Sequence, residues 1–133
     1  MTASIQPGYA YPLGAMPAKK GVNFSVYADK AQAVELLLFD HVDDATPAQV
    51  FHLNPAEHRT YHYWHAFVPG LKAGQIYAYR AIGVDTPDLG IRFDREKVLL
   101  DPYGRAVAMP GAYSREAASR PGDNAATAMK SVV

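Results

Sequence analysis

Hydrophobic and polar residues alternate along several short segments, and glycine, proline, asparagine and aspartate separate these segments at short intervals. In residues 21–27, Val22, Phe24 and Val26 would share one face of a strand and the residues between them the other. No segment before residue 113 has the 3.6-residue period of a helix. Short alternating segments bounded by turn formers are typical of a sandwich or barrel. We therefore predict an all-β fold, with strands at residues 21–27, 34–39, 49–53, 61–68, 76–82 and 97–100.

Residues 34–39 are apolar on nearly both faces of the predicted strand. Such a strand is central in its sheet or covered on both sides. Together with the segment 99–103, it leads us to expect an exposed apolar patch if no other domain covers it.

The last part of the chain has a different composition. Residues 114–130 contain almost no large apolar side chain, which is typical of a linker. We therefore predict a sandwich domain over residues 1–112 and a linker over 113–133. Ser131–Val133 resembles the start of a strand, and we expect it to lead into a further domain.

The length and net charge of the chain limit its possible functions. The 133 residues suit one domain, and 13 basic against 13 acidic residues give a net charge of zero. No basic field favours nucleic acid or an anionic membrane. The chain has no cysteine, no apolar stretch of roughly 20 residues and no signal-peptide pattern at its start. These features predict a cytoplasmic protein without a nucleic-acid or membrane partner.

Motifs for nucleotide binding or for a hydrolase nucleophile elbow are missing, so we expect no cofactor. Four histidines are close in sequence, at positions 52, 58, 62 and 65. On one strand His62 and His65 would point to opposite faces, and His58 in a turn could reach only one of them. We interpret them as surface residues and predict no metal site.

Glycoside hydrolysis needs two carboxyl groups facing each other across a cleft. Asp40, Asp43 and Asp44 form the one dense carboxylate cluster, and they lie in a proline-containing loop where solvated turn residues are expected. We therefore predict no catalytic residue in this chain.

Aromatic residues are concentrated between positions 61 and 79. Parity places Trp64 with Ala66 and Val68, which favours the core. Tyr61 and Tyr63 would lie together on the opposite face, about 7 Å apart, close to the spacing of successive glucose units. Core packing and a sugar platform both remain open for these two tyrosines.

The motifs, read in order, resemble the N-terminal domain of isoamylase-type debranching enzymes, the carbohydrate-binding-module-48 group. The matching segments are Tyr11–Gly14, Gly21–Ala28, Val34–Asp40, Trp64 with Val68–Leu71, Gly74–Arg80, Gly90–Asp94, Lys97–Tyr103 with Arg105–Val107, and Lys130–Val133. The segments from Gly90 onward resemble the bacterial glycogen-debranching branch in particular.

The resemblance implies an immunoglobulin-like antiparallel sandwich that precedes a catalytic (β/α)8 barrel. In that family the catalytic residues lie in the barrel, and the parent enzyme hydrolyses α-1,6 branch linkages of glycogen or limit dextrins with two carboxyl groups. The partner expected for this chain is therefore its own barrel.

One departure concerns sugar binding. Members of the group that anchor to glycogen carry a Trp in the loop after the second strand and a Lys directly after the first Tyr of a Tyr-x-Tyr strand. Here residues 41–46 include no aromatic residue, and the strand position is Ala78. We expect α-glucan to bind weakly or not at all, with Tyr61 and Tyr63 as the candidate contacts.

An accessory domain of a debranching hydrolase is the first interpretation. Two alternatives are a freestanding module that targets glycogen and a purely structural sandwich that mediates protein contacts.

Overall fold

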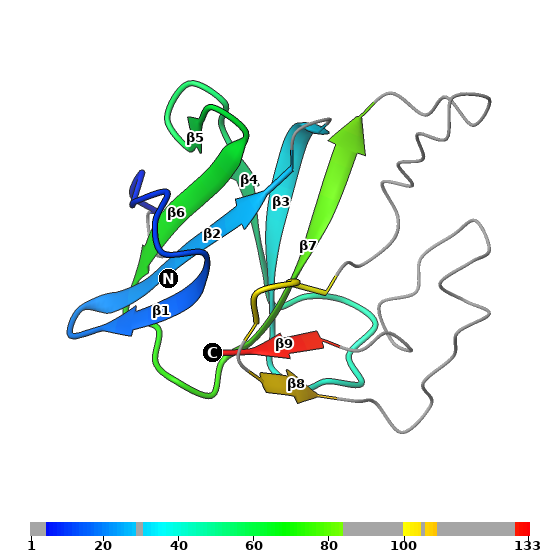
Figure 1. Cartoon of the computed structure of the whole chain (residues 1–133). Helices are drawn as coiled ribbons and strands as arrows, with labels where there is room; N and C mark the ends of the chain where they lie inside the picture. The colour runs from blue at the N-terminus through cyan, green and yellow to red at the C-terminus, as the bar shows by residue number, and fades with distance from the viewer. Residues whose placement is uncertain (1–4, 29–30, 84–99, 105, 109–129) are drawn as a thin grey trace.

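The computed structural model describes residues 5–28, 31–83, 100–104, 106–108 and 130–133. Every regular element in these residues is a strand, and the strands form two antiparallel sheets (Figure 1). The four-stranded sheet has the order β1 (Gly14–Ala18), β2 (Gly21–Tyr27), β6 (Tyr63–Pro69) and β5 (Arg59–Thr60). The five-stranded sheet has the order β4 (Gln49–Leu53), β3 (Ala31–Phe39), β7 (Ile76–Gly83), β9 (Lys130–Val132) and β8 (Ala106–Ala108). The predicted all-β antiparallel sandwich is confirmed.

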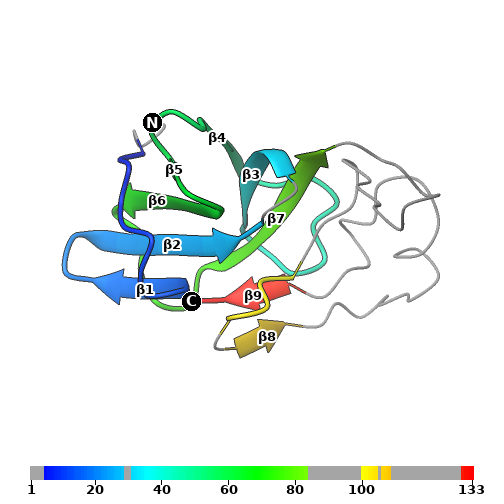
Figure 2. The ribbon, with the colours of Figure 1, turned by 45° about the horizontal axis from the view of Figure 1, so that its top comes forward.

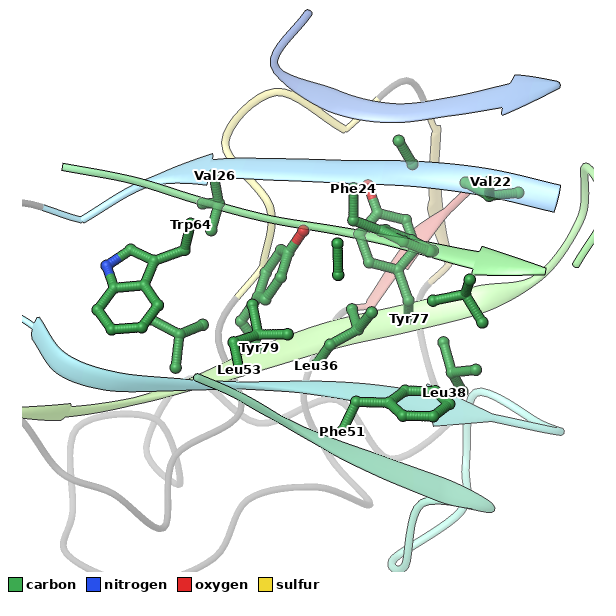
Figure 3. Close-up of a cluster of buried hydrophobic side chains, with 14 of the residues drawn as sticks. Val22, Phe24, Val26, Leu36, Leu38, Phe51, Leu53, Trp64, Tyr77 and Tyr79 are labelled. Atoms are coloured by element: carbon green, nitrogen blue, oxygen red, sulfur yellow. The ribbon is translucent and has the colours of Figure 1, made fainter. Parts of the chain in front are cut away.

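The main core lies between the inner faces of the two sheets (Figure 3). Phe24 of β2 meets Tyr77 of β7 edge to face, with 5.0 Å between ring centroids. Trp64 is fully buried, as predicted, and its indole nitrogen donates a hydrogen bond to the Ala28 carbonyl at 3.2 Å. The alternation of apolar and polar residues in β2 therefore predicts its inner face correctly, because Val22 and Val26 lie in the core together with Phe24.

Strand β3 lies between β4 and β7 and is buried on both faces. Leu36 and Leu38 join the main core, whereas Leu37 and Phe39 form a second cluster with Ala78 on the outer side. The prediction of a covered strand is confirmed. The expectation that this segment forms an exposed apolar patch is wrong, because the apolar side chains of β3 are buried within the chain.

Strand β9 pairs with both β7 and β8, with Ser131 opposite Tyr77 on one side and opposite Val107 on the other. It is thus part of the sandwich, although the predicted domain boundary at residue 112 leaves it out. Residues 113–129, and the strand residues 97–99, lie outside the described part of the chain, so the linker stays a prediction. The described residues contain no helix that could cross a membrane.

Candidate functional site

The outer face of the four-stranded sheet is crossed by the N-terminal strap, which we define as residues 5–11 (Figure 2). The strap first joins the free edge of β6, where Gln6 and Phe67 exchange two backbone hydrogen bonds of 2.8 and 2.9 Å. It then passes over β6 and β2. The Ser25 hydroxyl donates to the Ala10 carbonyl at 2.7 Å, so the strap follows the sheet surface to the start of β1.

The strap supplies hydrogen bonds to a polar, buried row of the sheet. Asn23 accepts from the Tyr9 amide at 2.8 Å and donates to the Tyr9 carbonyl at 3.0 Å. His65 Nδ1 lies 2.7 Å from the Pro7 carbonyl, which can only accept, so Nδ1 carries a proton and donates it; Nε2 shares a hydrogen bond of 2.7 Å with the Thr60 hydroxyl. The strap therefore makes burial of these polar residues tolerable.

Beyond the strap, the end of this face carries an aromatic cluster made of Tyr27, Tyr61, His62 and Tyr63. The Tyr27 ring packs edge to face on Tyr63 at 5.3 Å and on His62 at 5.9 Å, and Tyr61 lies 3.9 Å from His62, all between ring centroids. Tyr61 is 74% exposed and Tyr27 is 42% exposed. The cluster thus exposes aromatic residues to solvent.

Tyr61 lies in the turn between β5 and β6, because its φ of 58° is outside the strand region. The predicted strand 61–68 therefore starts two residues too early, and the expected placement of Tyr61 and Tyr63 on one strand face is wrong. The Arg59 guanidinium holds the turn by donating from Nε to the Tyr61 carbonyl at 2.8 Å, and it lies 5.3 Å from the Trp64 ring centre. Tyr61 and Tyr63 belong to one cluster, but with a different relative orientation from the one predicted.

The histidines differ in their surroundings. His52 is exposed and lies 2.9 Å from Glu35, as a surface interpretation requires. His58 and His65 are buried, so that interpretation is wrong for them. His58 Nδ1 accepts a hydrogen bond from the Asn54 amide at 3.0 Å, and burial lowers the pKa of His58. Among the described residues no three histidine or carboxylate side chains come together as metal ligands would.

The carboxylate cluster lies in a turn after β3. There Asp44 accepts a hydrogen bond from the His41 amide at 3.1 Å, while Asp40 and Asp43 are exposed. This is the solvated turn that the sequence predicts.

A buried polar centre at Asp101 was not predicted. The Tyr77 hydroxyl donates to Asp101 Oδ2 at 2.6 Å, the Tyr103 amide donates to Oδ1 at 2.9 Å, and the Asp101 amide donates to Ser131 Oγ at 3.0 Å. Burial, followed by the hydrogen bond to Asp101, raises the pKa of Tyr77, so the hydroxyl stays a donor. Asp-Pro-Tyr-Gly is a turn signal in the sequence, but its buried partners are distant in the chain.

Known proteins match this fold and sequence. Residues 12–104 match the family model of carbohydrate-binding module 48, the isoamylase N-terminal domain. The chain is 42% identical over 106 residues to a glycogen debranching enzyme of Serratia proteamaculans, covering 80% of this chain and 15% of that protein. It is 38% identical over 117 residues to a chloroplastic isoamylase, SU1, of Zea mays, covering 82% of this chain and 14% of that protein.

Solved structures match in fold. The pullulanase from Bacillus acidopullulyticus superposes with a TM-score of 0.61 at 19% identity, over 96% of this chain and 12% of that chain. The catalytic module of the pneumococcal protein SpuA, described as glycogen-degrading, gives a TM-score of 0.62 at 19% identity, over 96% of this chain and 17% of that one. Each of these proteins is thus several times longer than the region it shares with this chain. By its sequence match, the chain belongs to the carbohydrate-binding module 48 family, the isoamylase N-terminal domains.

Proposed function

We propose that this chain is the accessory domain of a glucan-debranching hydrolase, a longer polypeptide that cleaves α-1,6 branch linkages in glycogen or limit dextrins. The observation that carries the proposal is the 42% identity to a named glycogen debranching enzyme, of which the matched region is a small part. The cleavage itself belongs to a catalytic barrel outside this domain. The domain packs on that barrel and helps to shape the substrate groove.

The aromatic cluster is the surface of this domain that is suited to an α-glucan chain. The apolar face of a glucose ring stacks on an aromatic ring, and Tyr61, which is 74% exposed, can also offer its hydroxyl group to a sugar hydroxyl. The turn and Arg59 hold the backbone of Tyr61 in the left-handed region, so little further ordering of the backbone is needed on binding.

Neither of the two positions at which other family members anchor glycogen, the loop 41–46 and residue 78, has surroundings here that favour sugar binding. Ala78 is buried against Leu37 and Phe39, so a ligand has no access to its side chain. The turn at residues 41–46 is tied to β9, because the buried Lys130 ammonium donates to the Val42 carbonyl at 2.6 Å. One ring stacked on one sugar contributes about 1–2 kcal/mol, so we expect a dissociation constant no tighter than about millimolar.

The test of substrate contact is a chemical-shift titration of this chain with maltoheptaose. Shifts should be confined to the aromatic cluster, and Tyr61→Ala and Tyr63→Ala should remove them. Tyr9→Ala is the matched control, because Tyr9 is 73% exposed but lies outside the cluster. Micromolar affinity would instead favour the freestanding glycogen-targeting module.

The test of the parent activity uses the complete polypeptide encoded by the gene that contains this chain. It should release reducing ends from glycogen at branch points. If that polypeptide neither cleaves nor binds α-glucans, the proposal fails and the purely structural sandwich is favoured.

A further inference from the structure

Three segments of the described structure that lie close together each carry exposed apolar residues. The group, which we call the Tyr103 face, consists of Tyr11, Leu100, Tyr103 and Val107, with exposed fractions of 85%, 36%, 50% and 54%. The segment after Tyr11 contacts the Tyr103 turn directly, since a Cβ added to Gly14 would lie 2.6 Å from the Tyr103 carbonyl oxygen. Val107 continues the face onto β8.

This face is held rigidly from below by the Asp101 centre. Both carboxylate oxygens of Asp101 accept hydrogen bonds, its amide is bonded to Ser131, and its carbonyl accepts from the Gly104 amide at 3.1 Å. Gly104 packs closely on Ser131, which lies 3.1 Å from the position of an added Cβ. The backbone of the Tyr103 turn is therefore fixed on strand β9.

Exposed aromatic and aliphatic side chains on a fixed backbone are suited to a binding surface. Tyrosine is enriched among the residues that dominate interface energy, and a backbone that is already ordered reduces the entropy lost on binding. In addition, β8 is the end strand of the described five-stranded sheet, with Ala106 and Val107 exposed on it. An apolar end strand is normally covered or blocked in a native protein.

We propose that the Tyr103 face is the surface by which this domain docks on the catalytic domain of the same polypeptide. The proposal rests on the proposed function and adds which face is used. The relatives are several times longer than the matched region, so a large partner is attached to a domain of this family.

The position of β9 is compatible with a partner in the same polypeptide. β9 lies under the Asp101 turn, and Val133 is bonded through its backbone to Gly74 and Gln75. Figure 2 shows this end of the chain beside the start of β1. A domain attached after β9 would therefore begin next to the Tyr103 face, and tethering gives it a high effective concentration there. The aromatic cluster lies close by, on the β6 side of β2, because Tyr27 pairs with Tyr63 whereas Gly14 of β1 pairs with Ser25.

Hydrogen–deuterium exchange tests the proposal by comparing this 133-residue chain with the complete polypeptide. We expect the amides of residues 100–107 to exchange about tenfold or more slowly in the complete polypeptide, and those of residues 49–53, in β4 at the other end of the same sheet, to be unchanged. Protection confined to another face, in a polypeptide that cleaves glycogen, overturns the docking face but keeps the proposed function. A complete polypeptide without activity on glycogen contradicts the proposed function instead.

A matched pair of substitutions separates docking from folding. Val107→Lys and Val50→Lys each place a charge on an end strand of the same sheet, at valines that are 54% and 39% exposed. In the complete polypeptide Val107→Lys should abolish the protection of residues 100–107, and Val50→Lys should leave it in place. Both variants of the isolated chain should unfold at similar temperatures. Equal behaviour of the two variants in the complete polypeptide, or protection in the isolated chain through pairing of two copies, would refute the assignment.

Discussion

At the scale of single residues, two neighbouring tyrosines in the core have opposite hydrogen-bonding states. The Tyr77 hydroxyl donates to Asp101, whereas the Tyr79 hydroxyl is buried and has no hydrogen-bond partner among the described residues. Burial raises the pKa of Tyr79, so this group too stays protonated. Removing a hydroxyl should therefore have different effects at the two positions.

Tyr77→Phe should lower the free energy of unfolding by about 1–3 kcal/mol, because it takes a donor from a buried carboxylate. Tyr79→Phe should be neutral or stabilising, because it removes an unsatisfied polar group while keeping the ring. Urea unfolding of both variants beside the unsubstituted chain measures the difference. Equal destabilisation by the two substitutions would mean that the Asp101 hydrogen bond contributes nothing.

The buried His58 predicts a dependence of stability on pH. Burial lowers the pKa of His58, Glu57 opposes the shift and His65 adds to it. The unfolded chain, with a histidine pKa of about 6.5, then binds the proton more strongly than the fold does. The stabilisation is therefore complete above about pH 6.5 and is lost as the pH falls towards the lowered pKa of the fold.

Thermal unfolding between pH 7.5 and pH 5 tests this dependence. The midpoint should fall with pH, and the fall should be smaller in His58→Gln, in which an amide oxygen can replace the Nδ1 acceptor. His41→Gln is the control, because His41 is exposed in a turn and should leave the dependence unchanged. An identical pH profile for His58→Gln would assign the effect to other groups.

At the scale of elements, the N-terminal strap depends on one glycine. Gly8 has a φ of +69°, and an added Cβ would lie 2.5 Å from Asn23 Oδ1 and 2.7 Å from the Ala66 backbone carbon. Gly8→Ala should therefore lift the strap off the sheet. Gly70→Ala is the matched control. Gly70 has a φ of +84° and no atom within 4 Å of an added Cβ, so this substitution introduces backbone strain without a steric clash.

Gly8→Ala should lower the unfolding midpoint more than Gly70→Ala, whose cost is about 1–2 kcal/mol. It should also speed hydrogen exchange at the Tyr9 amide, which is bonded to Asn23. If both variants lose the same stability and the Tyr9 amide stays protected, the close contact of the strap is unimportant.

Strands β2 and β4 could be predicted with their bounds because alternation and turn formers are local signals. The start of β6 could not, because the left-handed conformation of Tyr61 is imposed by Arg59 and the neighbouring strands and no glycine marks it. The same is true of the strap. Its hydrogen bonds join residues far apart in sequence, such as Pro7 and His65. The local period and composition of the sequence therefore cannot predict them. The buried His65 was misread for this reason.

At the scale of the whole molecule, the aromatic cluster and the Tyr103 face lie near the same end of β2, on either side of it. Tyr27 of the cluster pairs with Tyr63 of β6, whereas Gly14, which contacts the Tyr103 turn, pairs with Ser25 on the β1 side. A catalytic domain docked on the Tyr103 face would therefore lie close to the aromatic cluster. Under the proposed accessory role, hydrolysis requires the rest of the polypeptide.

The 133-residue chain should therefore release no reducing ends from glycogen or branched dextrins. Retaining hydrolysis needs two carboxyl groups about 5–5.5 Å apart with free access to the sugar. Among the described residues, Asp101 uses both oxygens internally and Glu35 lies 2.9 Å from His52. The remaining described carboxylates lie in two loops, Asp40, Asp43 and Asp44 after β3 and Glu57 before β5. A reducing-sugar assay over many hours, beside the complete polypeptide as positive control, measures this. Turnover that copurifies with the chain and disappears in Asp43→Asn or Asp44→Asn would place a catalytic site in this domain and contradict the accessory role.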